Sequence, residues 1–226
     1  MVVGGREPEA GSPSLRFERA LWAAGLEWIV GIDEAGLGSL CGPVVAAAVC
    51  VVRAGKIVAG VRDSKLLSSQ RREALRREII DTAAAVGIGA ASVGEIERLN
   101  VRSASHLAMK RALARVGQCD HALIDGRPIK RDDLGPHTTI VDGDALSYSI
   151  ACASIVAKVT RDRLMKKLAA RYPSYGWDHN AGYGTGEHLA ALGRSGLTPY
   201  HRLGFRPVRA LLLQEGEGVD RRSVEP

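Results

Sequence analysis

The sequence predicts an α/β fold in which helices flank a mixed β-sheet, with a small helical appendage at the C-terminal end. Three observations support this prediction. Two apolar runs, 28–33 and 44–52, are joined by a polar, glycine-rich turn, as is typical of a β-hairpin. Helical and strand-like segments then alternate along the chain. A long amphipathic segment at 147–171 precedes a glycine-rich remainder.

The elements between the hairpin and the long helix follow from local composition. Residues 68–85 begin with two serines and are rich in helix-forming residues, so we expect a helix there. The apolar run at 87–93 is expected to form a strand, and 101–116 is expected to form a helix. Two short runs, 121–124 and 138–141, complete the expected sheet.

The long helix over 147–171 carries apolar residues at helical spacing. It should end at Tyr172, because the residue before Pro173 is disfavoured in a helical conformation. Beyond it, the sequence predicts only one short helix, near 186–192.

The length of the chain favours one domain. The folded body is expected to span 14–213, including the appendage at about 174–213. Residues 1–13 and 214–226 are rich in glycine, proline or charge, so flexible tails are expected there. No apolar run is long enough to cross a bilayer.

The chain carries an excess of positive charge. Its 226 residues include 31 Lys plus Arg against 25 Asp plus Glu, which gives a formal charge of +6. Such an excess attracts polyanions and favours nucleic acid as a partner, although a basic surface also serves solubility alone.

Cysteine and histidine are too scattered to predict a structural zinc site. The four cysteines form no C-x-x-C pair, and His179, His188 and His201 are dispersed in the sequence. No apolar leader segment opens the chain. Free thiols in a reducing cytoplasm are therefore expected.

Acidic residues follow several of the predicted strands. Asp33 and Glu34 end the first apolar run, while Asp125 and either Asp142 or Asp144 follow later short runs. Neighbouring side chains on a strand point to opposite faces, so both members of the first pair reach one site only where the strand ends, unless one contributes its carbonyl. A hard divalent cation relieves the repulsion between crowded carboxylates. An isolated Asp-Glu pair is more often an exposed turn, but three acidic strand ends together predict a metal site.

The glycine loop after the first acidic pair does not match known nucleotide-binding loops. Gly36-Leu37-Gly38 begins the dinucleotide-binding pattern, but the third glycine position of that pattern is Cys41. The phosphate-binding P-loop sequence does not occur either.

Several sequence blocks follow one another along nearly the whole folded body. They are GIDEAG at 31–36, GPVVAAAV at 42–49, DSKL at 63–66, ASIVAKVTRD at 153–162, GYGT at 182–185 with Glu187-His188, and His201-Arg202 with Phe205. In this order, the blocks resemble those of a known family, bacterial ribonuclease HII, also called type 2 ribonuclease H.

The resemblance implies a ribonuclease H-like fold and a metal-dependent endonuclease. Such an enzyme hydrolyses the RNA strand of RNA–DNA hybrids and cleaves at ribonucleotides embedded in duplex DNA. It implies four catalytic metal ligands, Asp33, Glu34, Asp125 and Asp144, and so selects Asp144 over Asp142. Two Mg²⁺ or Mn²⁺ ions would flank the scissile phosphate, one activating a water and the other stabilising the leaving 3′-oxygen, to give 3′-hydroxyl and 5′-phosphate ends. A cytoplasmic monomer with nucleic acid as its partner is expected.

The resemblance also implies residues that contact the substrate. Gly36, Leu37 and Gly38 would approach the ribonucleotide through main-chain groups, and the 2′-hydroxyl separates RNA from DNA. Tyr183 would pack against the sugar at the RNA–DNA junction, although by itself it reads as a core or turn aromatic. The family usually has Arg where this chain has Leu37, so a modest loss of phosphate affinity is expected.

Basic residues within the similar blocks are candidates for contacts with backbone phosphates, which weaken as salt rises. A solvated basic face is the alternative explanation for them. These candidates are Lys65, Lys158, Arg161, His201 and Arg202.

Alternative functions remain open at this level. Another nuclease of ribonuclease H-like fold would share the acidic cluster and act on all-DNA substrates. A non-catalytic nucleic-acid-binding module would bind in EDTA and never cleave. Ribonuclease HIII is disfavoured, because that family carries a long N-terminal domain and only 32 residues precede Asp33 here.

Overall fold

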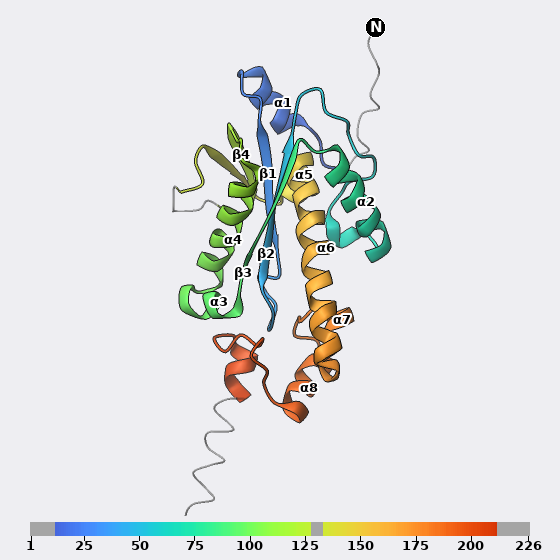
Figure 1. Cartoon of the computed structure of the whole chain (residues 1–226), viewed down its shortest axis with the longest axis vertical. Coiled ribbons are helices and arrows are strands. Elements are labelled where there is room, and N and C mark those ends of the chain that lie inside the picture. The colour runs from blue at the N-terminus through green and yellow to red at the C-terminus, as the bar shows by residue number, and fades with distance from the viewer. Residues whose placement is uncertain (1–11, 128–132, 212–226) are drawn as a thin grey trace, which may run out of the picture. The chain divides into compact units, whose positions relative to one another are not determined.

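A five-stranded mixed sheet runs through the residues that the computed structural model describes, 12–127 and 133–211 (Figure 1). The strand order is β3-β2-β1-β4-β5. β1 is antiparallel to β2 and parallel to β4, and β4 is parallel to β5. The predicted mixed sheet is thus confirmed. The strands are β1 (Ile29–Ala35), β2 (Val44–Val51), β3 (Ala85–Ala91), β4 (His121–Asp125) and β5 (His137–Ile140).

The expected helices are present, each within a few residues of its expected bounds. Sequence patterns missed the helix before β1, the one after β3 and two single-turn helices. None of the helices in the described chain is long and apolar enough to cross a membrane. The labelled α-helices are α1 (Arg16–Ala23), α2 (Ser69–Thr82), α3 (Val93–Leu99), α4 (Val101–Val116), α5 (Gly143–Leu146), α6 (Tyr148–Arg171), α7 (Trp177–Asn180) and α8 (Gly186–Ser195). The described residues 206–211 are helical as well.

The prediction of a strand over 87–93 was wrong at its C-terminal end. β3 stops at Ala91, and Ser92 begins α3 as its N-cap. The Ser92 hydroxyl accepts a hydrogen bond from the amide of Glu95, and the Glu95 carboxylate accepts one from the amide of Ser92. This capping box satisfies two backbone donors at once, so a helix starts within the apolar run that was expected to continue as a strand.

The chain divides into two compact units. The first is made of the described residues within Met1–Ala35, Val45–Ala90 and Ser105–Thr160. The second is made of those within Gly36–Val44, Ala91–Ala104 and Arg161–Pro226. The expectation of a single domain over 14–213 remains a prediction. The expected tail at 214–226 and most of the expected tail at 1–13 lie outside the described residues.

In the first unit, α2 and the first half of α6 pack on β2. Ala47 and Val49 of the strand share one apolar cluster with Leu75 and Ile79 of α2 and Ile155 of α6. α4 and α6 lie on opposite sides of the sheet (Figure 1). This double cover explains why every residue of β2 except the last is buried.

In the second unit, the core gathers around the C-terminal end of α6 and the short helices after it. Met165 of α6, Trp177 of α7 and Leu192 of α8 pack with Leu40 and Val208. The predicted helical appendage therefore builds its core together with a residue from the segment that follows β1.

All four cysteines are free thiols, as predicted. Cys41, Cys50 and Cys152 are buried, and Cys119 is half-buried. Burial raises the pKa of Cys41, Cys50 and Cys152 to about 12 and that of Cys119 to about 11. These groups are therefore neutral thiols at physiological pH.

Candidate active site

The register of the sheet brings two of the predicted acidic residues side by side. The parallel pairing of β1 with β4 ends at Ile32 and Ile124, and Asp33 and Asp125 are the next residue of each strand. The antiparallel pairing of β1 with β2 continues through Ala35. The expectation that the first strand ends at its acidic pair therefore holds only on the β4 side.

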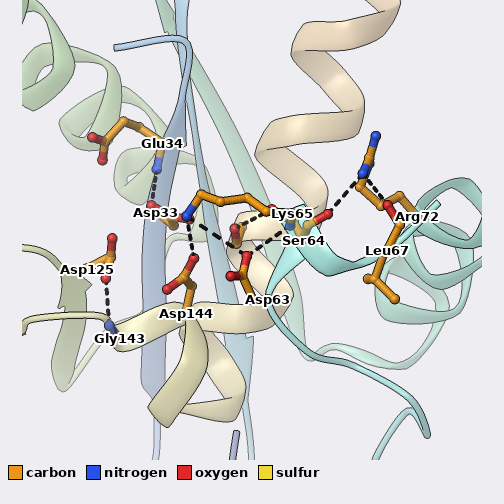
Figure 2. Close-up of polar contacts among 11 residues, drawn as sticks. Asp33, Glu34, Asp63, Ser64, Lys65, Leu67, Arg72, Asp125, Gly143 and Asp144 are labelled. Carbon is orange, nitrogen blue, oxygen red and sulfur yellow. Dashed lines mark hydrogen bonds and ion pairs between the residues drawn. The ribbon is translucent and has the colours of Figure 1, made fainter. Parts of the chain in front are cut away.

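Asp33, Glu34, Asp125 and Asp144 gather in the first unit around the ammonium group of Lys65, which also lies 3.9 Å from the Asp63 carboxylate (Figure 2). The Asp33 carboxylate accepts a hydrogen bond of 2.7 Å from the amide of Glu34. The Asp125 carboxylate accepts one of 2.7 Å from the amide of Gly143, the first residue of α5. The side chains of Asp33 and Asp125 are thus each held by a main-chain amide, one within β1 and the other at the start of α5.

The structure distinguishes Asp144 from its neighbour Asp142. Asp144 lies in α5, is 6% exposed and accepts a 3.1 Å hydrogen bond from Nζ of Lys65. Asp142 is exposed and has a left-handed backbone (φ 54°) just before α5. Of these two residues, only Asp144 belongs to the acidic cluster.

Three carboxylates of the cluster have raised pKa values. Burial, then the charges of Glu34 and Asp125, raise the pKa of Asp33 well above its usual value. Burial and the charge of Asp125 raise the pKa of Glu34 to about 7. Burial and the charge of Asp144 raise the pKa of Asp125. A bound cation would relieve each of these effects, because it favours the ionised form of every ligand.

This donor set fits a hard divalent cation. Mg²⁺ and Mn²⁺ prefer carboxylate oxygens, and the cluster offers four carboxyl groups. No three of these carboxylates have ligand oxygens that all lie within 4.8 Å of one another. Among the described residues, the only trio that meets this distance is Cys41, His188 and His201. Wider spacing is expected of like charges that repel.

The segment carrying Lys65 is tied to α6 and α2. The hydroxyls of Ser64 and Ser154 share a hydrogen bond of 3.0 Å. Arg72 of α2 donates to the carbonyls of Ser64 and Leu67, at 2.9 and 2.5 Å (Figure 2). Ser154 also lowers the pKa of Asp33, against the larger effect of burial.

In the second unit, two buried arginines hold the glycine loop. Arg161 donates to the carbonyls of Cys41 (3.1 Å) and Pro43 (2.9 Å). Arg202 donates to the carbonyls of Leu37 (3.0 Å) and Gly42 (2.9 and 3.0 Å). Both guanidinium groups are fully buried, and burial lowers the pKa of Arg202 to about 10. Neither group is presented to a phosphate, contrary to the expectation for these two arginines.

The loop itself is open only at its tip. Gly36 has a positive φ of 92°, and a Cβ there would lie 1.9 Å from Nε of Arg161, so only glycine fits. The Leu37 side chain is 37% exposed, and a Cβ on Gly38 would meet open space. The main chain at Gly38 is therefore accessible to a ligand, whereas the Leu37 carbonyl is bound by Arg202.

The other predicted substrate contacts differ in accessibility. Tyr183 is 38% exposed, and the Arg161 guanidinium lies 5.7 Å from its ring centre. Lys158, on α6 in the first unit, is half-buried. His201 is 1% exposed, so its side chain cannot meet a phosphate in this conformation.

His201 instead belongs to a buried histidine pair that the sequence did not reveal. The Trp177 indole donates to Nε2 of His188 (3.0 Å), so this nitrogen is unprotonated and Nδ1 donates to the Tyr183 carbonyl (3.0 Å). The amide of Thr198 donates to Nδ1 of His201 (2.9 Å), which leaves Nε2 of His201 to donate to Nε2 of His188 (3.1 Å). Every ring nitrogen is therefore used in a hydrogen bond.

These bonds argue against a metal at the nearby trio of Cys41, His188 and His201. The imidazole lone pairs already accept N–H donors. The Cys41 thiol is neutral, since burial raises its pKa to about 12. Arg161 and Arg202 lie close enough to act on that pKa, and two cations beside the trio oppose a third.

Comparison with known proteins identifies relatives of this chain. The family described as Ribonuclease HII matches residues 30–208. A ribonuclease HII of Thermosynechococcus vestitus is 52% identical over 202 residues, covering 89% of this chain and 94% of that relative. A ribonuclease HII of Cereibacter sphaeroides is 53% identical over 209 residues, covering 92% and 97%.

Solved structures share the fold at lower identity. Ribonuclease H2 from Pyrococcus horikoshii OT3 superposes with a TM-score of 0.69 at 22% identity, covering 83% of this chain and 98% of that one. Bst-RNase HIII, solved in complex with Mn²⁺, gives a TM-score of 0.63 at 19% identity, covering 84% and 71%. These likenesses confirm the α/β, ribonuclease H-like fold.

Proposed function

This chain belongs to the ribonuclease HII family, and from that premise we propose how its residues perform the reaction. It is a metal-dependent ribonuclease H that acts on nucleic acid. We propose that it hydrolyses the RNA strand of RNA–DNA hybrids and cleaves at ribonucleotides embedded in duplex DNA, leaving 3′-hydroxyl and 5′-phosphate ends. The observation that carries this proposal is the gathering of Asp33, Glu34, Asp125 and Asp144 where the pairing of β1 with β4 ends (Figure 2).

Asp33, Glu34, Asp125 and Asp144 are the proposed metal ligands and catalytic residues. Two Mg²⁺ or Mn²⁺ ions held by them would supply Lewis-acid activation of a water and stabilise the leaving oxygen. The raised pKa values of Asp33, Glu34 and Asp125 support this assignment, because they result first from burial of the carboxylates and then from the negative charges beside them. The Mn²⁺ complex of the structural neighbour Bst-RNase HIII is consistent with it.

Lys65 is proposed to contact a substrate phosphate. Its side chain is 77% exposed, and it reaches the cluster only through its terminal ammonium. Burial lowers the pKa of Lys65, but the hydrogen bond and charge of Asp144, with the charges of Asp63 and Asp33, raise it by more, so the group is a cation. Lys158 keeps the same proposed role.

The glycine loop and Tyr183 are proposed to recognise the ribonucleotide. The exposed tip at Leu37 and Gly38 offers main-chain groups, and a 2′-hydroxyl can both donate to and accept from such groups. Tyr183 is exposed enough to stack on a sugar. Arg161, His201 and Arg202 are proposed to support this loop and its surroundings, rather than to contact phosphates.

The decisive experiment compares three duplexes: RNA–DNA hybrid, DNA with one embedded ribonucleotide, and all-DNA. Each is incubated with Mg²⁺, Mn²⁺ or EDTA, and the ends are identified by their response to phosphatase and ligase. We expect cleavage of the first two duplexes only, and none in EDTA. Cleavage of all-DNA duplex would favour another ribonuclease H-like nuclease, and binding without cleavage in any metal would favour a non-catalytic module.

The remaining expectations are proposed with this function. We propose that the enzyme works as a monomer in the cytoplasm, and that 14–213 acts as one catalytic domain. Sedimentation of the full chain tests the first point.

A further inference from the structure

A buried glutamate in α1 lies at the start of α6. Oε1 of Glu18 accepts hydrogen bonds from the Ser147 hydroxyl (2.7 Å), the Ser149 amide (2.9 Å) and the Ser149 hydroxyl (2.7 Å). The side chain is fully buried, and its Oε2 has no hydrogen-bond partner among the described residues. The contacts join residues about 130 positions apart in the sequence.

Glu18 acts as a second cap of α6. Ser147 precedes the helix, and its hydroxyl accepts a hydrogen bond from the Ile150 amide (3.4 Å). The first amides of a helix lack partners within the helix, and a negative charge at this end is stabilised by the helix dipole. The Glu18 carboxylate satisfies the Ser149 amide, which the local cap leaves unpaired.

The same junction is held by the main chain on two sides. Ser14 donates its amide to the Leu146 carbonyl (3.1 Å) and accepts from the Tyr148 amide (3.1 Å). On the other side, a Cβ at Gly31 of β1 would lie 2.1 Å from the Ser149 carbonyl carbon. The start of α6 is therefore enclosed between β1 and the segment that leads into α1.

This junction carries the proposed metal ligand Asp144. The Ser147 amide donates to the Gly143 carbonyl (2.8 Å) and so closes α5, the single turn that contains Asp144. Gly143 in turn donates its amide to the Asp125 carboxylate (2.7 Å). A shift of Ser147 would therefore be transmitted to two carboxylates of the cluster.

We propose that Glu18 is a positioning residue: it fixes the start of α6 and thereby the place of Asp144 in the metal site. The inference rests on the proposed role of Asp144 as a ligand. Glu18 itself touches no part of the acidic cluster in any contact described above. Its influence should therefore appear in metal affinity rather than in the chemistry of cleavage at saturating metal.

Direct Mn²⁺ binding to the full chain, measured by calorimetry and by electron paramagnetic resonance of free Mn²⁺, tests the proposal without an activity assay. Glu18→Gln keeps the shape but replaces the anionic acceptor by a neutral amide. We expect Mn²⁺ affinity to fall about tenfold, as is typical when a group that orients a ligand is changed. The control Glu27→Gln removes an exposed carboxylate from the segment after α1 and should bind Mn²⁺ as the parent does.

A double-mutant cycle separates positioning from general destabilisation. In an Asp144→Asn background, Glu18→Gln should cause a smaller loss of Mn²⁺ affinity than in the parent, whereas in a Glu34→Gln background its full effect should persist. If Glu18→Gln does not fold, as judged by circular dichroism, Ser149→Ala replaces it. That variant removes one of the three donors to Glu18, and a smaller loss in the same direction is expected.

The possible results distinguish a failure of the proposed function from a failure of the positioning role of Glu18. A parent protein that binds no Mn²⁺ and cleaves no hybrid would contradict the proposed function itself. A parent that binds and cleaves, with Glu18→Gln or Ser149→Ala lowering the melting temperature but not Mn²⁺ affinity, would leave the function intact and overturn the positioning role. Equal losses of affinity in both double-mutant backgrounds would overturn it as well.

Discussion

The ammonium group of Lys65 lies 3.1 Å from Oδ2 of Asp144, and the two side chains differ sharply in exposure, at 77% and 8%. An exposed four-carbon stem can turn, whereas the buried carboxylate cannot. Lys65 can therefore leave Asp144 for a substrate phosphate without disturbing the core. Its contact with the acidic cluster and its proposed contact with substrate are compatible.

Replacing Lys65 by Ala should weaken hybrid binding and reduce its dependence on salt. Each phosphate contact releases about one counterion, so the slope of log affinity against log salt should fall by about one. Fluorescence anisotropy with a labelled hybrid measures this slope. Lys56→Ala, at an exposed lysine of the same unit, is the control. An unchanged salt slope for Lys65→Ala would show that Lys65 does not contact a phosphate.

Replacing Asp125 by Asn should abolish cleavage while the fold and hybrid binding persist. The amide keeps an oxygen that can accept from Gly143, but the charge that holds a cation is lost. We expect a loss of activity of more than about 100-fold, beyond the effect of changing a group that only orients a ligand. Asp142→Asn is the matched control, because Asp142 is exposed and asparagine tolerates its left-handed backbone. Normal turnover by Asp125→Asn would exclude Asp125 from the mechanism.

Replacing Arg202 by Lys should destabilise the protein without altering the salt dependence of binding. Lysine cannot reproduce the donors that Arg202 places on the Leu37 and Gly42 carbonyls. Leaving buried carbonyls unpaired should lower the free energy of unfolding by about 2–4 kcal/mol. Urea denaturation checks the stability, with exposed Arg209→Lys as the control. If Arg202→Lys were as stable as the parent but had a smaller salt slope, Arg202 would be a phosphate contact after all.

Acid should destabilise the protein through the buried histidine pair. Burial, and then the neighbouring His188, lower the pKa of His201 to about 4, against an ordinary value of 6.5. Between these pH values the unfolded state binds more protons, so the free energy of unfolding should decrease as pH falls from about 6.5 towards 4. Thermal unfolding across this range measures the effect.

The variant His201→Gln should show a smaller loss of stability in acid than the parent. His179→Gln should retain the full loss, since His179 is exposed and its pKa is raised, first by its hydrogen bond to Glu187. An identical pH profile for His201→Gln and the parent would show that the pair does not titrate as described.

Replacing Leu37 by Arg should strengthen binding of the hybrid. The loop is held by the Leu37 carbonyl and not by its side chain, which is 37% exposed, so the change should leave the loop in place. An added cation there should steepen the salt slope by about one. Binding and cleavage over a salt series measure this, and unchanged values would show that position 37 contacts no phosphate.

The sequence predicted the sheet and the strand-end carboxylates well, because both depend on local patterns. Apolar runs located β1 and β4, and their register then aligned Asp33 with Asp125. Spacing alone could not choose between Asp142 and Asp144. That choice depends on a single helical turn and on a lysine about 80 residues away, and it came from the family resemblance.

Other features depend on contacts that no local pattern reveals. Arginine is usually exposed, so the buried donors of Arg161 and Arg202 were expected on the surface. His188 and His201 are 13 residues apart and meet only because α8 and the segment after it fold together. The start of α3 is different, because the capping box of Ser92 and Glu95 is a local pattern that the sequence itself contains.

The distribution of the thiols has a practical consequence for labelling. Alkylating reagents attack thiolates that they can reach, and three of the four cysteines are enclosed as neutral thiols. A maleimide dye added to the folded protein should therefore react slowly and at one place, Cys119, just before β4. The unaltered chain thus provides its own attachment point for a fluorophore beside a strand that ends in the acidic cluster.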